Sequence, residues 1–451
     1  MKSRAAVILA AGQGTRMRSS LPKVLHKVGG RAMLDWSIDL ALNAGCERIV
    51  VVCSASGTAV QSHVENRLGR DAIAIQDPPQ GTGHAVMCAK DALAGFDGDL
   101  VVLCSDVPLT PSAAIEDLFD SLRTGTAVAV LGFEAADPAA YGRLILNGAG
   151  DLQAIVEAKE ASPEQLAISF CNSGIIAGDA AGMFELLGAV TNDNEKGEYY
   201  LTDIVGLAVS SGALCRTVSC TEQDVMGVNS QSELARAEAA FQARKRQEFL
   251  DFGVTMTAPS TVYFSHDTVL DSGVEIEPNV VFGAGVNVRA GAVIRAFSHL
   301  EGCVVESGCV VGPYARLRPG AVLEEGAKIG NFVEVKNTRV GKGAKANHLA
   351  YLGDGDVGAG ANIGAGTIFC NYDGFLKYRT EIGEGAFIGS NSALVAPVRI
   401  GKGAYVGSGS TITKDVSDNA LAVGRKRQVE RPDWASAFRD RMARIKAAKK
   451  G

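Results

Sequence analysis

The sequence predicts two domains of different class: an α/β domain with a Rossmann-like open sheet, followed by a parallel β-helix built from hexapeptide repeats. Before about residue 230, apolar runs such as ERIVVVCS and GDLVVLCSD alternate with helical patterns such as AMLDWSIDLALNAG, as in an open α/β sheet. Beyond Gly253 the chain is rich in glycine, and its apolar residues recur every six positions. A chain of 451 residues is also too long for one ordinary core.

The first domain begins with an apolar strand that leads into a glycine-punctuated loop, AAVILAAGQGTRMRSSLPKVLH. The run from Ala5 to Ala10 has the length and purity of a central parallel strand. Gly12 and Gly14 then let the backbone approach a ligand closely, so that amide groups can cradle phosphate oxygens. Arg16 and Lys23 add positive charge beside them. We therefore interpret the segment as a phosphate-binding loop.

A dinucleotide-binding loop is a less suitable interpretation of this segment. Such a loop reads GxGxxG and is followed, about 20 positions on, by an acidic residue that holds a ribose hydroxyl. Here Gly14 is followed by Thr15, Arg16 and Met17, and the next charges are basic, which suits a triphosphate better than a nicotinamide cofactor. An ordinary strand-turn-helix connection remains the alternative.

A charged helix with few helix-breaking residues is expected over residues 230–252. We interpret it as a spacer between the two domains. A core helix of the first domain is the less favoured alternative, because its apolar positions are sparse.

A period of six residues is the signature of a parallel β-helix, in which each unit supplies one short strand and one turn. Side chains at equivalent positions of successive turns then stack into an apolar core. The repeating positions are Ile276, Phe282, Val288, Ile294 and Leu300; Val305, Val311, Leu317, Leu323, Ile329 and Val335; Val357 and Ile363; and Ile382, Ile388, Leu394, Ile400, Val406 and Ile412.

The six-residue step is interrupted between Val335 and Ile382, at NTRVGKGAKANHLAYLGDGD and again at CNYDGFLKYRT. Insertions in a solenoid leave the core and form loops, where sites occur. Basic residues, a histidine and a tyrosine gather around these interruptions: Arg316, Arg318, Lys336, His348 and Tyr351. This set suggests a phosphorylated substrate near a general base.

Charge and composition argue against several classes of function. A formal net charge of −6 gives no electrostatic footprint for nucleic acid. No apolar stretch approaches membrane-spanning length, and the first residues lack a signal-peptide pattern, so we expect a cytoplasmic protein without membrane insertion. Ten cysteines occur without a CxxC pair, and we interpret them as reduced thiols, mostly in the core.

With both halves considered, the chain resembles the family of bacterial bifunctional N-acetylglucosamine-1-phosphate uridylyltransferases and glucosamine-1-phosphate N-acetyltransferases. The resemblance runs from Ala6 to about Arg427 and includes the order of the domains. It implies a left-handed, triangular β-helix and a homotrimer with acyl sites between subunits. It also implies a uridylyltransferase domain over 1–229, a linker helix over 230–252, an N-acetyltransferase domain over 253–425 and a basic tail or helix over 426–451.

For uridylyl transfer from UTP to N-acetylglucosamine-1-phosphate, the resemblance implies nucleotide, metal and sugar sites. Arg16 and Lys23 would act on the phosphates as catalytic residues, and Asp106 and Asn229 would bind Mg²⁺ through oxygen atoms. In isolation, an aspartate that ends a strand is often only a cap or turn residue. The other positions are Leu9, Ala11 and Gly12 against the nucleotide, Gln76, Gly81 and Thr82 at the uracil, and Gly142, Glu157, Asn172 and Tyr199 at the N-acetylglucosamine moiety.

For acetyl transfer from acetyl-CoA to glucosamine-1-phosphate, the resemblance assigns His348 as the general base, because the amine is largely protonated in water. A histidine taken at random is more often structural, but His348 lies near Lys336 and Tyr351 in the sequence. Asn371 would help polarise the acetyl carbonyl, an oxyanion-type catalytic role. The other positions are Arg318 and Lys336 at the sugar phosphate, Tyr351, Asn362 and Tyr372 around the sugar, and Ala365, Ser390, Ser408 and Arg425 at acetyl-CoA.

Two positions depart from the family pattern. Ser105 precedes Asp106, where the family more often has glycine or alanine. Ser408 stands where the family frequently has alanine, a change that a backbone contact would tolerate.

Three hypotheses of different classes follow. The leading one is an enzyme with both activities, which makes UDP-N-acetylglucosamine for envelope polymers. The second is a single-activity nucleotidylyltransferase whose β-helix is structural or regulatory, and the third is a non-catalytic nucleotide-sugar sensor. The presence of Lys23, Asp106 and Asn229 argues against the sensor, and the presence of Lys336 and His348 argues against a purely structural β-helix. The basic tail is interpreted mainly as a solvated terminal helix.

Overall fold

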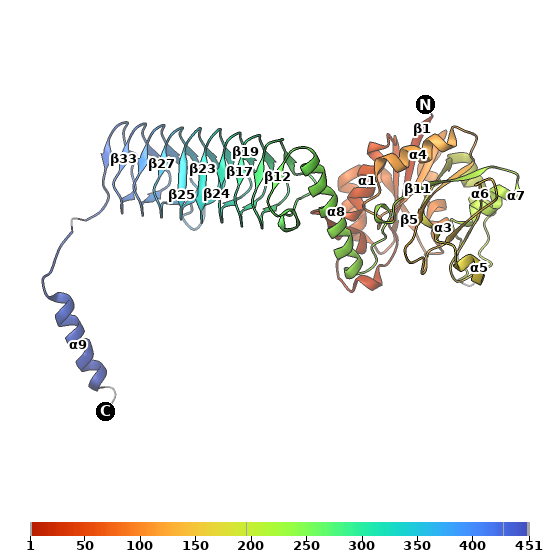
Figure 1. Ribbon diagram of the computed structural model, residues 1–451, viewed down its shortest axis with the longest axis horizontal. Coiled ribbons are helices and arrows are strands. Elements are labelled where there is room, and N and C mark those ends of the chain that lie inside the picture. Colours follow the sequence, from red (N-terminus) through yellow and green to blue (C-terminus); the bar gives the residue numbers. More distant parts are fainter. Residues whose placement is uncertain (1, 195, 427, 449–451) are drawn as a thin grey trace. The chain divides into compact units, whose positions relative to one another are not determined.

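A computed structural model describes residues 2–194, 196–426 and 428–448. The chain divides into two compact units, one comprising residues up to 248 together with 264–266, and the other comprising residues 249–263 and those from 267 onward. Figure 1 shows the first unit as mixed helix and sheet and the second as a stack of short coils. No helix in the described ranges is both long and apolar enough to cross a membrane.

The first unit is built on a nine-stranded sheet whose main order is β11-β7-β10-β6-β1-β4-β5. Strand β1 (Ser3–Leu9) pairs in parallel with β4 (Arg48–Ser54) on one side and with β6 (Gly98–Cys104) on the other. Strand β10 (Phe170–Asp179) runs antiparallel to β6 and to β7 (Val128–Glu134), so the sheet is mixed. The remaining strands are β5 (Ile73–Gln76), β8 (Arg143–Leu146), β9 (Leu152–Val156) and β11 (Cys215–Cys220), with a separate pair β2 (Lys27–Val28) and β3 (Arg31–Ala32).

Helices cover both faces of this sheet, because alternate residues of β1 belong to two apolar cores. Ala6 and Ile8 contribute to a core that includes residues of α1, α2 and α4, whereas Ala5 and Val7 contribute to one that includes residues of α3, α6 and α7. The helices are α1 (Met33–Asn43), α2 (Thr58–Leu68), α3 (Thr82–Cys88), α4 (Ser112–Leu122), α5 (Pro163–Leu166), α6 (Ala180–Ala189) and α7 (Asp203–Ser210).

The helix expected as a spacer is α8 (Gln231–Asp251), and it packs on the first unit as far as residue 248. Its apolar positions are few, but Ala237 and Phe241 lie one turn apart and are buried against Val28 and Met33. The packing of residues 231–248 favours the alternative of a core helix, because a narrow apolar stripe is enough to hold a long helix, while the last residues of α8 belong to the second unit and the spacer role stays a prediction.

A buried glutamine on α8 explains why residues 264–266 belong to the first unit. The Gln242 amide donates to the Phe264 carbonyl oxygen at 2.7 Å and accepts from the Phe264 amide nitrogen at 2.9 Å. These two hydrogen bonds resemble those of a residue pair in a β-sheet, and they satisfy the polar atoms of the Gln242 side chain, which is only 3% exposed.

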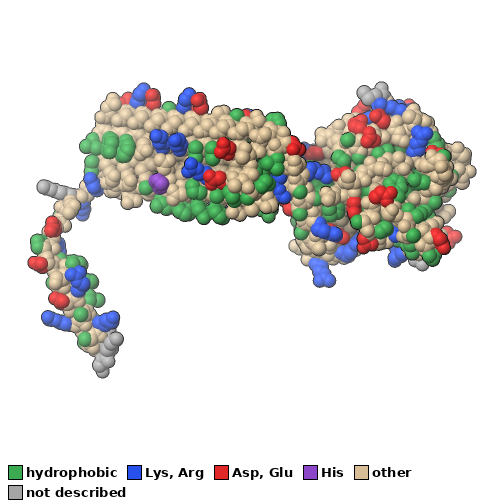
Figure 2. All heavy atoms as spheres, viewed as in Figure 1, with side chains coloured by type: hydrophobic (Ala, Val, Ile, Leu, Met, Phe, Trp, Pro, Cys, Tyr) green, Lys and Arg blue, Asp and Glu red, His purple; other side chains and the backbone are tan. Residues whose placement is uncertain are grey.

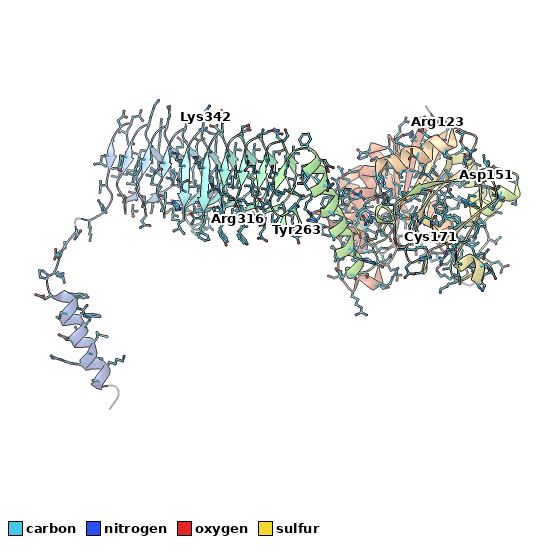
Figure 3. All side chains as sticks on the ribbon, viewed as in Figure 1. Arg123, Asp151, Cys171, Tyr263, Arg316 and Lys342 are labelled. Atoms are coloured by element: carbon cyan, nitrogen blue, oxygen red, sulfur yellow. The ribbon has the colours of Figure 1, made fainter. Side chains whose placement is uncertain are left out.

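The second unit is a parallel β-helix. Strands of successive turns pair in register to form a ten-stranded and a fourteen-stranded sheet. In the two-residue strand β21 (Arg316–Leu317), Leu317 is buried and Arg316 is exposed and points away from the coil, as Figure 3 shows. Outward polar and inward apolar residues recur in this way along the stack, which confirms the apolar core predicted from the six-residue period.

The strands of this unit, and the one helix of the described tail, have the following bounds. They are β12 (Thr255–Met256), β13 (Val269–Leu270), β14 (Glu275–Ile276), β15 (Val281–Phe282), β16 (Asn287–Val288), β17 (Val293–Ile294), β18 (His299–Leu300), β19 (Val304–Val305), β20 (Val310–Val311), β22 (Val322–Leu323), β23 (Lys328–Asn331), β24 (Glu334–Val340), β25 (Lys345–His348), β26 (Tyr351–Val357), β27 (Asn362–Ile363), β28 (Ile368–Cys370), β29 (Thr380–Ile382), β30 (Phe387–Ile388), β31 (Ala393–Val395), β32 (Val398–Ile400), β33 (Tyr405–Val406), β34 (Thr411–Ile412), β35 (Leu421–Ala422) and α9 (Trp434–Ala448).

The first expected interruption of the repeat is not a loop. Strands β24, β25 and β26 carry the stack through this segment, because the inward step shortens from six residues to five between Val335 and Val340 and between Leu352 and Val357. Only the second interruption leaves the stack, between β28 and β29, where Tyr372 and Lys377 form an isolated antiparallel bridge. A shortened step keeps the segment within the stack, whereas an insertion leaves the stack as a loop.

The ten cysteines are free thiols, and six of them are buried, as the sequence analysis expected. The expected tail over 426–451 contains α9, whose described residues have no buried side chain. Residues 427 and 449–451 of that tail lie outside the described residues.

Replacing Phe241 with alanine tests the packing of α8. The Phe241 side chain is 6% exposed, and its ring centroid lies 5.6 Å from that of Trp36. Truncating a buried phenylalanine costs about 3–5 kcal/mol, so the first unit should unfold at a lower urea concentration. Fluorescence of Trp36 reports this transition when Trp434, the other of the two tryptophans, is replaced by phenylalanine in every variant.

The matched control is Arg236→Ala on the same helix, whose side chain is 67% exposed. This change should alter the free energy of unfolding by less than about 0.5 kcal/mol. An unfolding midpoint that is equally insensitive to Phe241→Ala would show that α8 is a spacer.

Candidate active sites

The first candidate site lies where the central strand β1 ends. Because β1 pairs with β4 on one side and with β6 on the other, its carboxyl end is a point where the strand order reverses and ligands bind. A cavity of about 570 Å³ opens there. Nine residues that the sequence assigned to this site line the cavity: Leu9, Ala11, Gly12, Lys23, Gln76, Gly81, Thr82, Asp106 and Glu157.

Three oxygen and nitrogen atoms meet at the floor of this site. The Lys23 ammonium lies 2.5 Å from Oδ2 of Asp106 and 3.1 Å from Oδ1 of Asn229. Asn229 is held in turn by Glu233, whose carboxylate accepts from the Asn229 amide nitrogen at 2.7 Å. Two oxygens from distant parts of the chain thus converge on one cation, a donor set that also fits a hard divalent ion such as Mg²⁺.

Within the described ranges, no three His, Cys, Asp or Glu side chains gather as a metal site. A divalent ion at Asp106 and Asn229 would therefore need further oxygen ligands, which substrate phosphates and water commonly supply to Mg²⁺.

The hydroxyl of the unusual Ser105 is turned towards strand β1, although the residue also lines the cavity. Its side chain is 2% exposed, and its hydroxyl donates to the Leu9 carbonyl oxygen at 2.5 Å. This hydrogen bond ties the end of β6 to the end of β1, so the extra side chain lies between strands.

Burial raises the pKa of Glu157 above its usual value. The Lys196 ammonium and a hydrogen bond from the Thr202 hydroxyl, at 3.4 Å, oppose this rise. Glu157 and Lys196 both line the cavity. A carboxylate that accepts hydrogen bonds from sugar hydroxyls would therefore become protonated at a higher pH than an exposed glutamate.

Five assigned residues do not line this cavity: Arg16, Gly142, Asn172, Tyr199 and Asn229. Arg16 is exposed on the turn after the phosphate loop, and Asn229 reaches the site through Lys23. Gly142 and Asn172 are bonded to each other, from the Asn172 amide nitrogen to the Gly142 carbonyl oxygen at 2.8 Å.

The expectation for Tyr199 is corrected. The backbone of Tyr199 bonds to Gln80 and Gly83, and its side chain packs against an apolar core. The neighbouring Tyr200 lines the cavity instead. Two adjacent tyrosines on an irregular segment give no periodicity from which their directions could be predicted.

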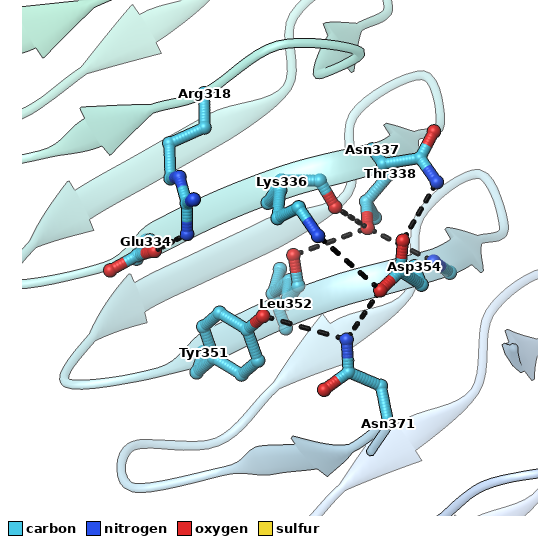
Figure 4. A network of polar contacts seen from close by, with 10 residues as sticks. Arg318, Glu334, Lys336, Asn337, Thr338, Tyr351, Leu352, Asp354 and Asn371 are labelled. Carbon is cyan, nitrogen blue, oxygen red and sulfur yellow. Dashed lines mark hydrogen bonds and ion pairs between the residues drawn. The ribbon is translucent and has the colours of Figure 1, made fainter. Parts of the chain in front are cut away.

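The second candidate site lies on the β-helix, on β24, β26 and the loop after β28. Figure 4 shows Lys336, Tyr351 and Asn371 around the buried carboxylate of Asp354. Arg318 lies nearby and pairs with Glu334 at 2.8 Å. The structure thus brings together four assigned residues, Arg318, Lys336, Tyr351 and Asn371.

Lys377 is a basic residue of this site that the sequence analysis did not single out. The pKa of Lys377 is lowered, first by a side-chain hydrogen bond with Lys336 and then by the positive charge of the Lys336 ammonium group. Two interacting lysines, with Arg318 nearby, are suited to an anion such as a phosphate group. Lys377 lies in the segment CNYDGFLKYRT, but nothing in that pattern distinguishes it from a solvated lysine.

His348 lies apart from this group, on β25 and on the other side of the corner formed by Leu349 and Ala350. Its Nδ1 lies 2.6 Å from Oδ1 of Asn331, and it lines a cavity of about 320 Å³ with the basic residues Arg295 and Lys328. Arg318, Lys336, Tyr351 and Asn371, all described, are not among the residues that line this cavity.

A column of equivalent positions runs from His348 along the β-helix. Lys345, Asn362, Phe387 and Tyr405 pair in register in successive turns. Three positions further along each turn, the same register aligns His348, Ala365, Ser390 and Ser408 with one another. The hydrogen bonds from Asn391 to Ala365 and from Gly409 to Ser390, both 2.7 Å, support this alignment.

Arg425 lies next to the end of this column: the pairing of Tyr405 with Leu421 places its neighbour Gly424 level with Ser408, and the Arg425 side chain approaches Gly409. Asn362 lies on β27, three residues before Ala365. Tyr372 is exposed at the start of the loop between β28 and β29, where its hydroxyl donates to the Gly374 carbonyl oxygen at 2.6 Å. The residues assigned to acetyl-CoA therefore form one continuous edge that begins at the assigned base.

Comparisons with known proteins identify the family. The chain is 63% identical over 448 residues to the bifunctional protein GlmU of Hyphomonas neptunium, which covers 99% of this chain and 97% of the relative. It is 58% identical to the bifunctional protein GlmU of Caulobacter vibrioides, over 97% of this chain and 95% of that protein. The chain belongs to the GlmU family.

Family models divide the GlmU chain as the structure does. Residues 6–165 match the MobA-like NTP transferase domain. Residues 302–337 and 379–414 match the bacterial transferase hexapeptide repeat, so the second unit is a left-handed β-helix. Among solved structures, the inositol-1-phosphate CTP transferase from T. maritima aligns with 54% of this chain and 97% of its own, at 17% identity and a TM-score of 0.44.

As a GlmU protein the chain is a bifunctional uridylyltransferase and acetyltransferase, which confirms the two activities of the leading hypothesis. The single-activity and sensor hypotheses are thereby set aside.

Proposed function

We propose that each activity of this GlmU chain belongs to one unit: uridylyl transfer to the cavity at the end of β1, and acetyl transfer to the β-helix. The observation that carries the first assignment is the convergence of Asp106 and Asn229 on the Lys23 ammonium. The second is supported by the group of Arg318, Lys336 and Lys377, which is suited to a sugar phosphate.

In the first unit, a phosphate oxygen of N-acetylglucosamine-1-phosphate attacks the α-phosphorus of UTP. The new P–O bond forms as the bond to pyrophosphate breaks, and no covalent enzyme intermediate is needed. Because this chemistry depends on alignment and charge neutralisation, Arg16 and Lys23 on the phosphates are the catalytic residues. The binding residues are Leu9, Ala11 and Gly12 for the nucleotide, Gln76, Gly81 and Thr82 for uracil, and Gly142, Glu157 and Asn172 for the sugar.

Asp106 and Asn229 would hold Mg²⁺ in this site, with Lys23 moving onto the phosphates. The ion, when bound, supplies charge neutralisation for the phosphate oxygens. Lys196, Glu198 and Tyr200, which also line the cavity, add polar contacts that the sequence did not indicate.

In the second unit, the amine of glucosamine-1-phosphate attacks the thioester carbonyl of acetyl-CoA. The C–N bond forms as the amine proton passes to His348 as general base; the C–S bond then breaks, and the protonated His348 returns that proton to the sulfur, so that coenzyme A leaves as the thiol. Arg318 and Lys336 bind the sugar phosphate, and Tyr351, Asn362, Asn371 and Tyr372 surround the sugar. Ala365, Ser390, Ser408 and Arg425 bind acetyl-CoA along the column described above.

The acetyl site would be completed by other copies of this chain in a homotrimer. Exposed hydrophobic side chains line one edge of the β-helix in Figure 2. Phe297, Tyr314 and Phe332 are each about half exposed and stack in successive turns, with neighbouring ring centroids 4.8 and 5.2 Å apart. The exposed Leu349 occupies the equivalent position of the next turn, beside His348. A continuous apolar ridge of this kind marks an interface.

The product, UDP-N-acetylglucosamine, would serve the synthesis of peptidoglycan and lipopolysaccharide. Cytoplasmic location is supported by the two co-substrates, UTP and acetyl-CoA, and by the free thiols.

Two substitutions test the division of activities. His348→Ala should lower acetyl transfer by at least about 100-fold, because the base is lost, and should leave uridylyl transfer unchanged. Asp106→Ala should do the reverse, because one of two cation ligands is lost. Release of thiol and of pyrophosphate is measured separately on each variant. A folded variant that loses both activities would contradict the two-site assignment.

The environment of Glu157 predicts a pH effect. If ionised Glu157 binds the sugar, the KM for N-acetylglucosamine-1-phosphate rises as the pH falls through the raised pKa of Glu157. Removing the Lys196 ammonium in Lys196→Gln raises that pKa further, so the rise in KM should begin at a higher pH. Lys196→Arg keeps the charge and is the matched control. Identical pH profiles for Lys196→Gln and the wild type would refute this role.

A further inference from the structure

Asp354 is the centre of the polar network in the acetyl site, although nothing in its sequence context marked it. Its Oδ1 accepts from the Asn337 amide at 2.7 Å, and its Oδ2 accepts from the Asn371 amide at 2.5 Å, as drawn in Figure 4. The Lys336 ammonium lies 3.7 Å from the same Oδ2. The residue is only 7% exposed.

The fold builds this position from two successive turns. Asp354 has a φ of +52°, and Asn337, one turn earlier, has a φ of +44°. Between them the buried Thr338 hydroxyl, which accepts from the Gly355 amide nitrogen, lies within hydrogen-bond distance of the Lys336 and Leu352 carbonyl oxygens and has one hydrogen to donate to them. Left-handed backbone at a non-glycine residue is costly, and it persists where the surrounding contacts hold it.

Glycine at position 353 lets the network close. A Cβ atom at Gly353 would collide with the hydroxyl of Tyr351 and with the amide nitrogen of Asn371. Both side chains can therefore approach Asp354 only because no side chain stands beside it.

The carboxylate fixes which way the Asn371 amide faces. A carboxylate only accepts hydrogen bonds, so the group that Asn371 turns towards Asp354 is its nitrogen. The second hydrogen of that nitrogen points towards the Tyr351 hydroxyl, at 3.5 Å. The Oδ1 atom of Asn371 accepts no hydrogen bond from the described residues, and both donors of the amide are in use.

This orientation opposes the oxyanion-type role expected from the sequence. Stabilising a negative oxygen requires an N–H donor, and the Asn371 side chain has none left to offer. A carbonyl oxygen is instead suited to accept a hydrogen bond from an N–H group.

We propose that Asp354 is a positioning residue for acetyl transfer, which holds the Asn371 amide so that its oxygen accepts a hydrogen bond from the amino group of the sugar phosphate. This role rests on the acetyl site proposed above. With one N–H of the amine held by Asn371, the nitrogen lone pair is directed towards the thioester carbonyl. The attack itself is unchanged: the C–N bond forms, the C–S bond breaks and the proton goes to His348.

Asp354 remains a carboxylate in this environment. Burial favours its neutral form, but hydrogen bonds from Asn337 and Asn371 and the charges of Lys336 and Lys377 outweigh burial and lower the pKa of Asp354. The acceptor that orients Asn371 therefore stays ionised to a lower pH than an ordinary aspartate.

Exchanging the two residues tests the proposal. Asp354→Asn leaves two amides facing each other and lets Asn371 turn over, and Asn371→Asp places two carboxylates in contact. Each single change should lower kcat/KM for glucosamine-1-phosphate by about 10- to 100-fold. In the double variant, the new amide at position 354 still accepts from Asn337 through its oxygen and donates to the new carboxylate at position 371. The second oxygen of that carboxylate faces the substrate, so kcat/KM measured at a pH above the acidic limb of both proteins should return to within about threefold of the wild type.

A pH profile separates positioning from a merely structural role. The new carboxylate at position 371 of the double variant would lie beside the substrate amine and favour its protonated form, so the acidic limb of acetyl transfer should move to higher pH. The titratable groups around this position are Tyr351 and Asp354 on β26, Lys336 on β24, and Lys377 and Tyr378 on the loop. This measurement compares only the double variant with the wild type, so it tests the positioning role of Asp354 even if a single variant does not fold.

Two outcomes would overturn the proposal. One is a folded double variant as impaired as the worse single variant, and the other is an acidic limb that does not move. Uridylyl transfer and urea unfolding serve as controls in every variant. If His348→Ala retained acetyl transfer, the proposed site itself would fail, and that result is distinguishable from a failed exchange.

Discussion

Parallel pairing of strands in register is the constraint on which both sites of this chain depend. In the first unit, β1 pairs with β4 and β6, and this places the phosphate loop at the reversal point of the sheet. In the second unit, pairing between turns repeats each position along one edge, so that His348, Ala365 and Ser390 form a column. Backbone hydrogen bonds therefore decide where the functional side chains stand.

The two sites use charge in different ways. The floor of the first site balances the Lys23 cation against Asp106 and the amide oxygen of Asn229, so an entering phosphate and a divalent ion can share these groups between them. The second site holds Lys336 and Lys377 close enough to lower the pKa of Lys377, which leaves an excess of positive charge for an anion to neutralise. Asp354 limits that excess and gives the neighbouring amide a fixed direction.

Much of the fold could be predicted from local pattern. The strand expected at residues 5–10 corresponds to β1, because a short, purely apolar run followed by glycines is typical of a buried strand that ends in a turn. The six-residue period identified the inward residues of the β-helix, because each turn must bury one side chain per strand. The position of α8 was not predictable in this way, since Ala237 and Phe241 are buried by residues distant in the sequence.

Much of the first site could be predicted as well, but the less obvious residues depend on geometry that the sequence does not display. A step of five in place of six looks like an interruption, although the strands β24 to β26 continue. Tyr200 rather than Tyr199 lines the cavity, and Asp354 becomes a centre of hydrogen bonds only because its backbone is left-handed beside Gly353. Such features arise from packing between turns and loops, which no short motif encodes.

The most direct test of two independent sites in one chain is a coupled assay on purified protein. Glucosamine-1-phosphate, acetyl-CoA, UTP and Mg²⁺ are supplied together, and free thiol and pyrophosphate are followed separately. The account predicts that thiol appears first and that pyrophosphate follows, with both also formed when each half-reaction is supplied alone. Pyrophosphate formed only from added N-acetylglucosamine-1-phosphate, with no thiol under any condition, would contradict it.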